Sequence, residues 1–186
     1  PWRLGQGHIA GDPDSMFSDV CFDITGLHAF NRLLQEGYLC PLVPKATTAK
    51  LDTDGVHMRG GEFIASELQA AVDKHPVTVA ALKEAVQLAG DRASWLVFCA
   101  GVEHAVHVAD ILTELGVECK AVHSKLDAAE RDAAIADWKA GKLRAISNNN
   151  VMTTGIDHPA LDCIVMLRPT ASTVLWVQML GRGTRP

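Results

Sequence analysis

The second half of the chain alternates short apolar runs with helical patterns, and this alternation limits the fold more than any other feature. Runs rich in strand-forming residues occupy positions 95–99, 119–123, 143–147 and 163–167. Apolar residues at helical spacing lie between them, over 102–115 and 127–139. Strands joined through helices pair in parallel by right-handed crossovers. The pattern therefore predicts an α/β fold in which a parallel sheet is flanked by helices on both faces.

The first half is less regular. Apolar residues at helical spacing occur over 27–35, 62–74 and 77–89. The proline-containing segment 39–48 is predicted to be an edge strand or a connector. We place the boundary between the two parts near residue 92. This predicts an irregular extension with the first helices over 1–92 and a compact α/β core over 93–186.

The composition argues against several classes of protein. With 17 Lys and Arg residues against 22 Asp and Glu residues, the formal charge is −5, so a nucleic acid would have to be held locally. Five cysteines without a CxxC pair fit reduced thiols better than metal ligands. The apolar runs are too short to span a membrane and no signal peptide is present, which predicts a cytoplasmic protein. Because the chain starts without Met and stops among arginines, we expect it to be part of a larger protein.

Small residues follow the first predicted strand, in the loop AGVEHA at 100–105. This loop leads into a predicted helix, and the backbone N–H groups at a helix N-terminus can bind a phosphate. The alternative is a tight strand-to-helix turn without a ligand, which is the commoner use of such loops.

A segment rich in amides and hydroxyls, NNNVMTTGIDHP at 148–159, follows the third predicted strand. Such groups donate to phosphate or sugar oxygens without carrying net charge, which suits an acidic domain that binds a polyanion. Gly155 permits a backbone conformation closed to other residues, and Asp157 can accept from a ribose hydroxyl. The alternative is an Asn-rich turn in which Asp157 bonds its own backbone.

The chain ends in VQMLGRGTRP, which holds two arginines three positions apart. On a helical turn Arg182 and Arg185 share a face, and Gln178 lies one turn before Arg182. Two guanidinium groups presented together match a phosphate chain better than lysines would. The alternative is two solvated arginines at a frayed end.

Together these segments resemble a known family. In this order, WLVFCAGVEHA, NNNVMTTGIDHP and QMLGRGTRP resemble motifs IV, V and VI of the second RecA-like domain of superfamily 2 helicases. The QxxGRxxR pattern is complete in Gln178, Gly181, Arg182 and Arg185. The resemblance extends more loosely to PWRLGQG at 1–7 and to FDITGLHAFNRLLQEGYLCPL at 22–42. The branch looks like bacterial or phage DNA-repair helicases and restriction-type translocases.

The resemblance implies roles at a nucleotide. Arg182 and Arg185 would be catalytic arginine fingers that reach the γ-phosphate of ATP bound to the other lobe, and Gln178 would help to position them. Gly155 and Asp157 would approach the ribose and the phosphates.

The resemblance also implies a nucleic-acid track. Its contacts would be Gly101, Ser124, Asn149, Thr153 and Thr154. Asn149 stands where the family usually has a threonine, and Asn150 where an aspartate is common. His123 would lie along the same track, although a partly buried histidine at a strand end is the structural alternative.

Two motifs that hold ATP in such motors are absent from this sequence, a GxxxxGK[ST] loop and an acidic DExx motif after a strand. The implied cofactor, ATP with Mg²⁺, would therefore be bound mainly by a first RecA-like lobe of the same polypeptide, and this chain alone would not hydrolyse ATP. The implied partners are that lobe and DNA, or RNA in its place.

The function implied by the resemblance is the C-terminal motor lobe of an ATP-dependent helicase or translocase. Two alternatives stay open. One is a non-catalytic α/β module that binds a nucleotide or a protein, because a fold does not fix a function. The other is a translocase subunit of a restriction system.

Overall fold

A computed structural model describes residues 2–3, 7–8, 10, 17–19, 26–153 and 156–186 of the chain. These residues form two compact units, one of residues 1–41 with Pro186 and one of residues 42–185. In the first unit, β1 (Trp2–Arg3) pairs antiparallel with β2 (Gly7–His8). This unit also contains α1 (Gly26–Gln35), which confirms the helix predicted over 27–35. The candidate site described below lies in the second unit.

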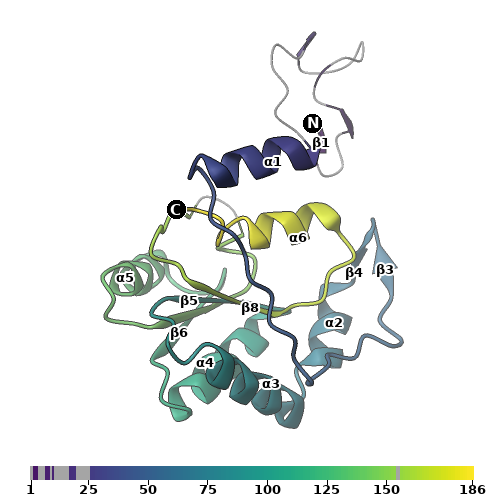
Figure 1. The fold of residues 1–186 in the computed structure, drawn as a ribbon. Helices are drawn as coiled ribbons and strands as arrows, with labels where there is room; N and C mark the ends of the chain where they lie inside the picture. The colour runs from purple at the N-terminus through teal and green to yellow at the C-terminus, as the bar shows by residue number, and fades with distance from the viewer. Residues whose placement is uncertain (1, 4–6, 9, 11–16, 20–25, 154–155) are drawn as a thin grey trace. The chain divides into compact units, whose positions relative to one another are not determined.

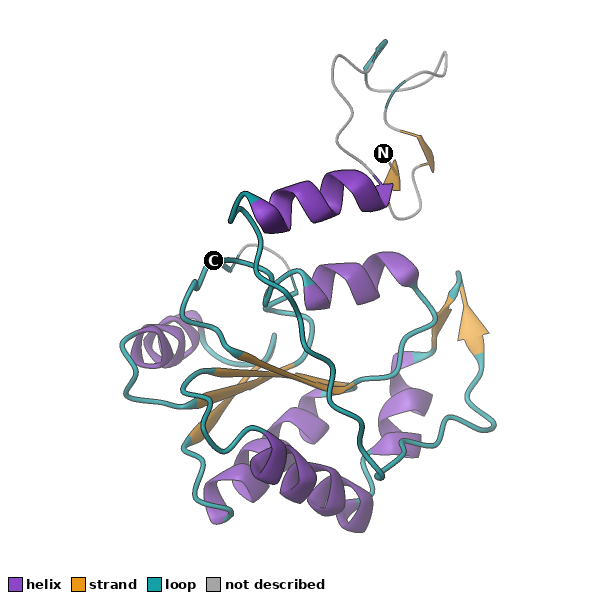
Figure 2. Ribbon diagram, in the orientation of Figure 1, coloured by secondary structure: helices purple, strands orange, loops and turns teal. Residues whose placement is uncertain are grey.

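A four-stranded parallel sheet forms the centre of the second unit, between two layers of helices (Figure 1, Figure 2). Its strands, in spatial order, are β6 (Cys119–Val122), β7 (Ala145–Asn148), β5 (Trp95–Cys99) and β8 (Cys163–Leu167). All three pairings are parallel. The predicted fold class and all four predicted strands are therefore confirmed.

Helices cover both faces of this sheet. On one face lie α3 (His75–Leu88) and α4 (Val102–Glu114), and on the other lie α5 (Ala128–Lys139) and α6 (Thr173–Leu180). Along β5, Trp95, Val97 and Cys99 enter the core beneath α3 and α4, whereas Leu96 and Phe98 enter the core beneath α5 and α6. Successive side chains of a strand point to opposite faces, so a sheet covered on both sides requires a continuous apolar run such as β5.

The ends of several elements differ from the prediction. The strand predicted over 143–147 begins at Ala145. Arg144, just before it, donates to the carbonyl of Gly90 at 2.6 Å, and its guanidinium lies 5.2 Å from the centre of the Trp95 ring. These contacts hold the side chain of Arg144 against Gly90 and Trp95, just before the first residue of β7. The helix predicted over 127–139 begins at Ala128, because the Asp127 carboxylate caps it by accepting from the N–H of Ala129.

The helix predicted over 62–74 is shorter than expected. It becomes α2 (Ala65–Val72), preceded by the antiparallel pair β3 (Met58–Arg59) and β4 (Glu62–Phe63). Gly60 and Gly61, with φ of 63° and 80°, turn the chain back between these strands. The helical spacing over 62–74 therefore covered both a hairpin strand and a helix.

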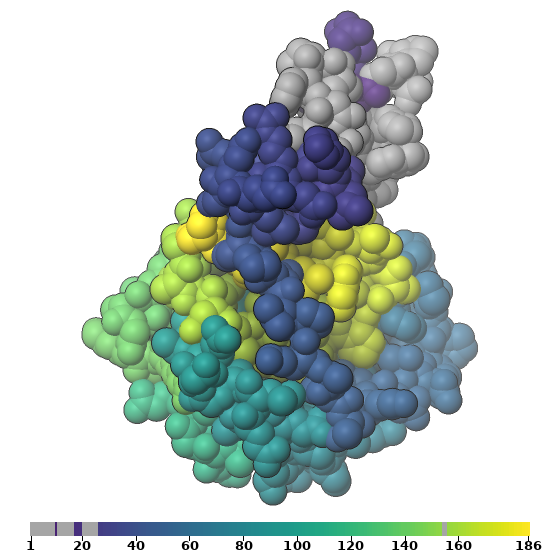
Figure 3. All heavy atoms as spheres, in the orientation of Figure 1, coloured from purple at the N-terminus to yellow at the C-terminus, as the bar shows by residue number. Residues whose placement is uncertain are grey.

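The segment 39–48 forms neither helix nor strand, so it is a connector. The part of it in the second unit crosses the face of that unit seen in Figure 3. The backbone N–H groups of Thr48 and Ala49 donate to the Glu84 carboxylate at 3.0 and 3.1 Å. Further along, Leu51 packs against the core beneath α3 and α4. These contacts fasten the connector to the helical layer of α3 and α4.

Three cysteines are held as thiols by the fold. Burial raises the pKa of Cys99 well above its ordinary value, that of Cys119 to about 12 and that of Cys163 to about 11. These thiols therefore stay protonated at neutral pH. None of the helices in the described part of the chain is long and apolar enough to cross a membrane.

His104, on α4, is a fully buried histidine that the fold holds in its neutral form. Its Nδ1 accepts a hydrogen bond from the N–H of Ala100 at 3.3 Å. Its Nε2 is buried and has no hydrogen-bond partner among the residues that the structure describes. Burial lowers the pKa of His104, an effect that the charge of Asp73 opposes and His107 reinforces.

This lowered pKa predicts an acid-sensitive fold. Below the ordinary histidine pKa of about 6.5, His104 binds a proton in the unfolded chain but stays neutral in the folded protein. Stability is therefore lost as the pH falls through that value. We expect the free energy of unfolding, measured by urea titration, to fall between about pH 7 and about pH 5. His104→Asn keeps an acceptor for Ala100 and should show a shallower fall. Equal pH slopes for the two proteins would exclude His104 as the responsible group.

Candidate functional site

Two arginines and one aspartate come together where α6 ends. The Nη1 of Arg182 donates to the carbonyl oxygen of Ile156 at 2.7 Å. The Nη1 of Arg185 forms an ion pair with the carboxylate of Asp157. We call Asp157, Arg182 and Arg185 the arginine cluster. The segment 148–159 and the C-terminal segment VQMLGRGTRP, which the sequence separates, therefore contribute to one site.

Local structure explains how α6 delivers these arginines. The hydroxyl of Ser172 caps the helix by accepting from the N–H of Leu175 at 3.3 Å, and Met179 anchors it in the core. The helix ends at Leu180, and the N–H of Arg182 bonds the carbonyl of Met179 at 3.2 Å in a final turn. The backbone of Arg182 therefore lies close enough to Ile156 for its side chain to contact that carbonyl.

The prediction that Arg182 and Arg185 share a helical turn is wrong, because α6 ends before both. Beyond the end of α6, the chain passes close to β8 at Gly183. A Cβ atom at this position would lie only 2.8 Å from Cδ1 of Ile164, so a residue with a side chain would not fit without displacement. The extended segment after Gly183 brings Arg185 to Asp157. Gln178 lies on the exposed side of α6, and its carbonyl faces the Nε of Arg182 at 3.5 Å.

The electrostatics of the arginine cluster leave positive charge available. Burial lowers the pKa of Arg182, the charge of Arg185 adds to this, and Asp157 opposes it. Asp157 is paired with Arg185, whereas Arg182 bonds a backbone carbonyl, so the two guanidinium groups and one carboxylate of the arginine cluster carry net positive charge. The side chain of Asp157 is 71% exposed and that of Arg185 is 37% exposed. An ion pair this exposed contributes only about 0–1 kcal/mol, so a stronger anion can replace the carboxylate.

The described residues between β7 and β8, 149–153 and 156–162, lie between the carboxyl end of β7 and the amino end of β8. At the start of this segment, the Nδ2 of Asn149 donates to the carbonyl of Cys99 at 3.1 Å. Near its end, the ring of His158 hydrogen-bonds the Ser94 hydroxyl at 3.0 Å, and the Asp162 carboxylate accepts from the N–H of Ser94 at 2.9 Å. Asp157 therefore lies on the stretch that passes the end of α6.

The residues predicted to contact nucleic acid differ in exposure. Gly101, Asn149 and Thr153 are buried, whereas Ser124 is exposed at the end of β6. The side chain of Gln69 covers Gly101 so closely that a Cβ atom at this position would lie 1.5 Å from the Gln69 Oε1. Thr154 and Gly155 lie outside the described residues.

His123 is buried at the end of β6, as its structural alternative predicted. Its Nδ1 has no hydrogen-bond partner in the part of the chain that the structure describes.

Sequence reasoning missed Arg168 at the end of β8. Its Nη1 donates to the side-chain oxygen of Asn150, which follows β7 and has the left-handed φ of 60°. The adjacent Thr170 donates its hydroxyl hydrogen to the Glu62 carboxylate. An arginine followed by proline directly after an apolar strand was the available signal, because carboxyl ends of parallel strands are where ligands gather.

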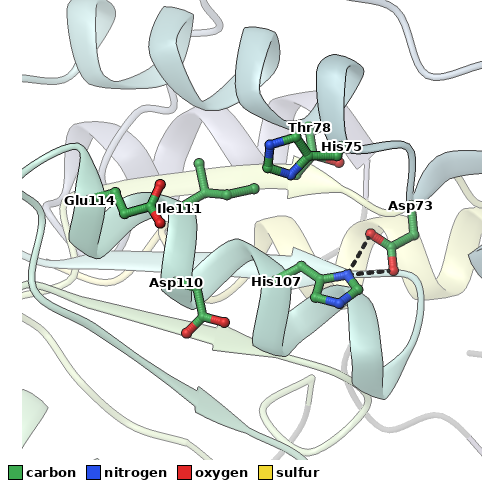
Figure 4. A pocket seen from close by; sticks show the side chains of 7 residues that line it. All are labelled: Asp73, His75, Thr78, His107, Asp110, Ile111 and Glu114. Atoms are coloured by element: carbon green, nitrogen blue, oxygen red, sulfur yellow. Dashed lines mark hydrogen bonds and ion pairs between the residues drawn. The ribbon is translucent and has the colours of Figure 1, made fainter.

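A separate hollow of about 420 Å³ lies between α3 and α4, away from the arginine cluster. Its lining includes His75, Asp110 and Glu114, together with His107, whose Nδ1 bonds the Asp73 carboxylate at 2.9 Å (Figure 4). Among the described residues, no group of three or more His, Cys, Asp or Glu side chains could hold a metal ion. The acidic and imidazole groups of this hollow therefore form no metal centre.

Residues 78–186 match the family model of the helicase conserved C-terminal domain. This range includes the whole parallel sheet and the arginine cluster.

Two curated relatives are yeast helicases. The chain is 33% identical over 143 residues to irc3 of Schizosaccharomyces pombe, whose name describes a mitochondrial ATP-dependent helicase. It is 27% identical over 157 residues to IRC3 of Saccharomyces cerevisiae. The matched regions cover 76% and 82% of this chain but only 24% and 22% of the relatives. The chain thus spans about a quarter of the length of the curated relatives it matches.

Two solved structures share the fold. Dbp5 of S. cerevisiae, bound to RNA and ADP BeF3, aligns with a TM-score of 0.52 at 23% identity, over 59% of this chain and 29% of Dbp5. A fragment of an HsdR subunit of a type I restriction enzyme from Vibrio vulnificus YJ016 aligns with a TM-score of 0.52 at 22% identity, over 61% of this chain and 25% of the fragment. At these identities the likeness establishes the fold alone.

Proposed function

Since the chain belongs to the family of helicase conserved C-terminal domains, the second RecA-like lobe of superfamily 2 helicases, we propose that its arginine cluster acts on ATP held by a first lobe of the same protein. The observation that supports this most strongly is the convergence of Arg182 and Arg185 on the loop that holds Asp157. Asp157 lies 28 positions before Arg185 in the sequence, in a different segment of the chain. Folding assembles them on one surface.

The arginine cluster suits a polyphosphate in its chemistry. A guanidinium binds two phosphate oxygens at once, and two guanidinium groups side by side match successive phosphates. The weak pair between Arg185 and Asp157 would open when a phosphate replaces the carboxylate. Asp157 would then be available to accept from a ribose hydroxyl. Bound ATP with Mg²⁺, held mainly by the first lobe, would supply the phosphoryl group and the metal charge.

We propose a division of work between the arginines. Arg182 is anchored to the Ile156 carbonyl and would keep the loop and the tail together. The side chain of Arg185 is 37% exposed and would move toward the transferring phosphoryl group when the lobes close. Gln178, one turn before Arg182, would help to orient both, and Gly155 would approach the nucleotide in the family's manner.

The nucleic-acid track would lie at the carboxyl ends of the strands. Ser124 is exposed there and would contact a DNA or RNA backbone directly, as Thr154 would. Gly101, Asn149 and Thr153 are buried. They would support the track indirectly, by holding the ends of β5 and β7 in place under the bound strand. Residues 1–92 would contain the end of the first lobe, the linker and the first helices of this lobe, and 93–186 its core.

ATP turnover by the full-length protein tests this function. We expect hydrolysis that single-stranded or duplex DNA, or RNA, stimulates, measured by phosphate release with each polymer in turn. Movement along duplex DNA without strand separation would assign the motor to restriction-type translocation. No turnover with any polymer would instead support a non-catalytic binding module.

A further inference from the structure

A groove of about 480 Å³ lies at the carboxyl end of β8, apart from the arginine cluster. Its walls come from α6, β4, the residues after β8 and the connector near residue 50. The lining residues that matter here are Phe63, Met166, Arg168, Thr170 and Trp176. We call this the aromatic groove. It combines aromatic and apolar surface with one cation, a lining typical of sites that bind a small ring with an attached charge.

We propose that the aromatic groove holds one unstacked base of a single-stranded nucleic acid, with Trp176 stacked on the base and Arg168 paired with the neighbouring phosphate. This proposal rests on the proposed function, because it assumes that the lobe binds a nucleic acid. It adds a base-holding site to a track otherwise made of backbone contacts.

Trp176 provides the stacking surface. It is 46% exposed on α6, although Trp95 and Trp138 are almost completely buried in the same unit. Phe63 and Met166 are partly buried and line the groove with it. An indole in such a position presents a π-face, which every base can stack on whatever its sequence.

Arg168 provides the charge. Its Nη1 is held by Asn150, and its Nε is buried and has no hydrogen-bond partner among the residues that the structure describes. A guanidinium has five N–H donors, so the contact with Asn150 leaves further donors on its terminal nitrogens for an anion. Asn150 holds the guanidinium in position before a ligand arrives, which reduces the entropy cost of binding.

Glu62, a carboxylate whose charge acts on Arg168, already has hydrogen-bond donors of its own. Glu62 accepts from the Thr170 hydroxyl and from the N–H groups of Phe63 and Ala171, the last at 3.2 Å. Burial raises the pKa of Glu62, but these hydrogen bonds and the charge of Arg168 outweigh burial and lower it. Glu62 therefore stays ionised, orders the residues after β8 and leaves the arginine directed at the groove.

A nucleic acid fits the aromatic groove better than a protein segment does. An aromatic side chain of a protein could fill the apolar part but would need a separate acidic residue beside it to pair with Arg168. A nucleotide joins a flat ring and a phosphate in one unit. Because the whole chain carries a formal charge of −5, it lacks a general basic surface and needs local sites of this kind.

Binding of fluorescent single-stranded DNA and RNA oligonucleotides to the full-length protein tests the proposal, with anisotropy measured over a range of salt concentrations. Trp176→Ala should weaken binding between about fivefold and a hundredfold, as removal of a stacking residue does, and Trp176→Phe should retain most of the affinity. Arg168→Gln should reduce the slope of log K against log salt by about one phosphate contact. Leu88→Ala, an exposed apolar control at the end of α3, should bind like the wild type.

An oligonucleotide with abasic positions separates stacking from a general loss of structure. Wild-type protein should bind it more weakly than the intact strand, and Trp176→Ala should bind both equally. Full affinity of Trp176→Ala for the intact strands would overturn the base-holding site, while stimulated ATP turnover would leave the motor function standing. If the wild type binds neither DNA nor RNA, both proposals fall. Comparing the DNA and RNA arms shows which polymer supplies the base.

Discussion

Arg185→Ala in the full-length protein is expected to reduce ATP turnover about a thousandfold or more and to weaken ATP binding far less. An arginine that neutralises charge on a transferring phosphoryl group acts mainly in the transition state, and its loss therefore appears in kcat. The structure pairs this guanidinium with an exposed carboxylate, Asp157, and we expect the phosphoryl group to replace that carboxylate. Steady-state phosphate release and nucleotide titration, measured on the same samples, separate the two effects.

Two further variants sharpen this test. Arg185→Lys keeps the charge but loses the planar fork of donors, and it should also be strongly impaired. Arg59→Ala removes an exposed arginine from β3, outside the arginine cluster, and should turn over like the wild type. Wild-type turnover in Arg185→Ala would refute the assignment of Arg185 as an arginine finger.

Trp138→Ala is expected to lower the free energy of unfolding by about 3–5 kcal/mol, the range for removing a large aromatic side chain from a core. Trp138 is 1% exposed on α5 and packs with Leu96 and Met179 beneath the sheet. Its ring centre lies 4.3 Å from that of His158, next to Asp157 in the chain. The variant should therefore also loosen the loop that carries the arginine cluster. Urea unfolding followed by circular dichroism measures the stability.

Trp176→Ala is the matched control for this prediction, because it removes the same side chain from an exposed position on α6. Its stability should stay within about 0.5 kcal/mol of the wild type, as expected for surface substitutions. A loss below about 1 kcal/mol in Trp138→Ala would show that the core beneath α5 and α6 closes over the missing ring, contrary to its tight packing here.

Much of the fold could be predicted from local pattern. The four strands and the helices between them repeat at the periods that strands and helices impose, so their order is readable without coordinates. The predicted ends of strands and helices were less accurate, because the observed ends depend on contacts with residues elsewhere in the chain. Arg144 leaves its predicted strand to bond Gly90, which is 54 positions away.

The candidate site divides in the same way. The residue types at Asp157, Arg182 and Arg185 were enough to predict phosphate chemistry, because carboxylates and guanidiniums keep their properties wherever they lie. The spacing predicts that the two arginines share a helical turn, but α6 stops at Leu180 and the chain then passes close to Ile164 at Gly183. Local periodicity carries no information about that contact with Ile164.

The order of strands and helices, and the chemical character of the loops, thus follow from residue pattern alone, since both depend on neighbours in the chain. Burial of Asn149, pairing of Asp157 with Arg185 and the place of Arg168 in the aromatic groove appear only after folding. Each depends on segments that are distant in sequence and come together when both faces of one sheet are covered. Core packing, which acts between such segments, selects these contacts.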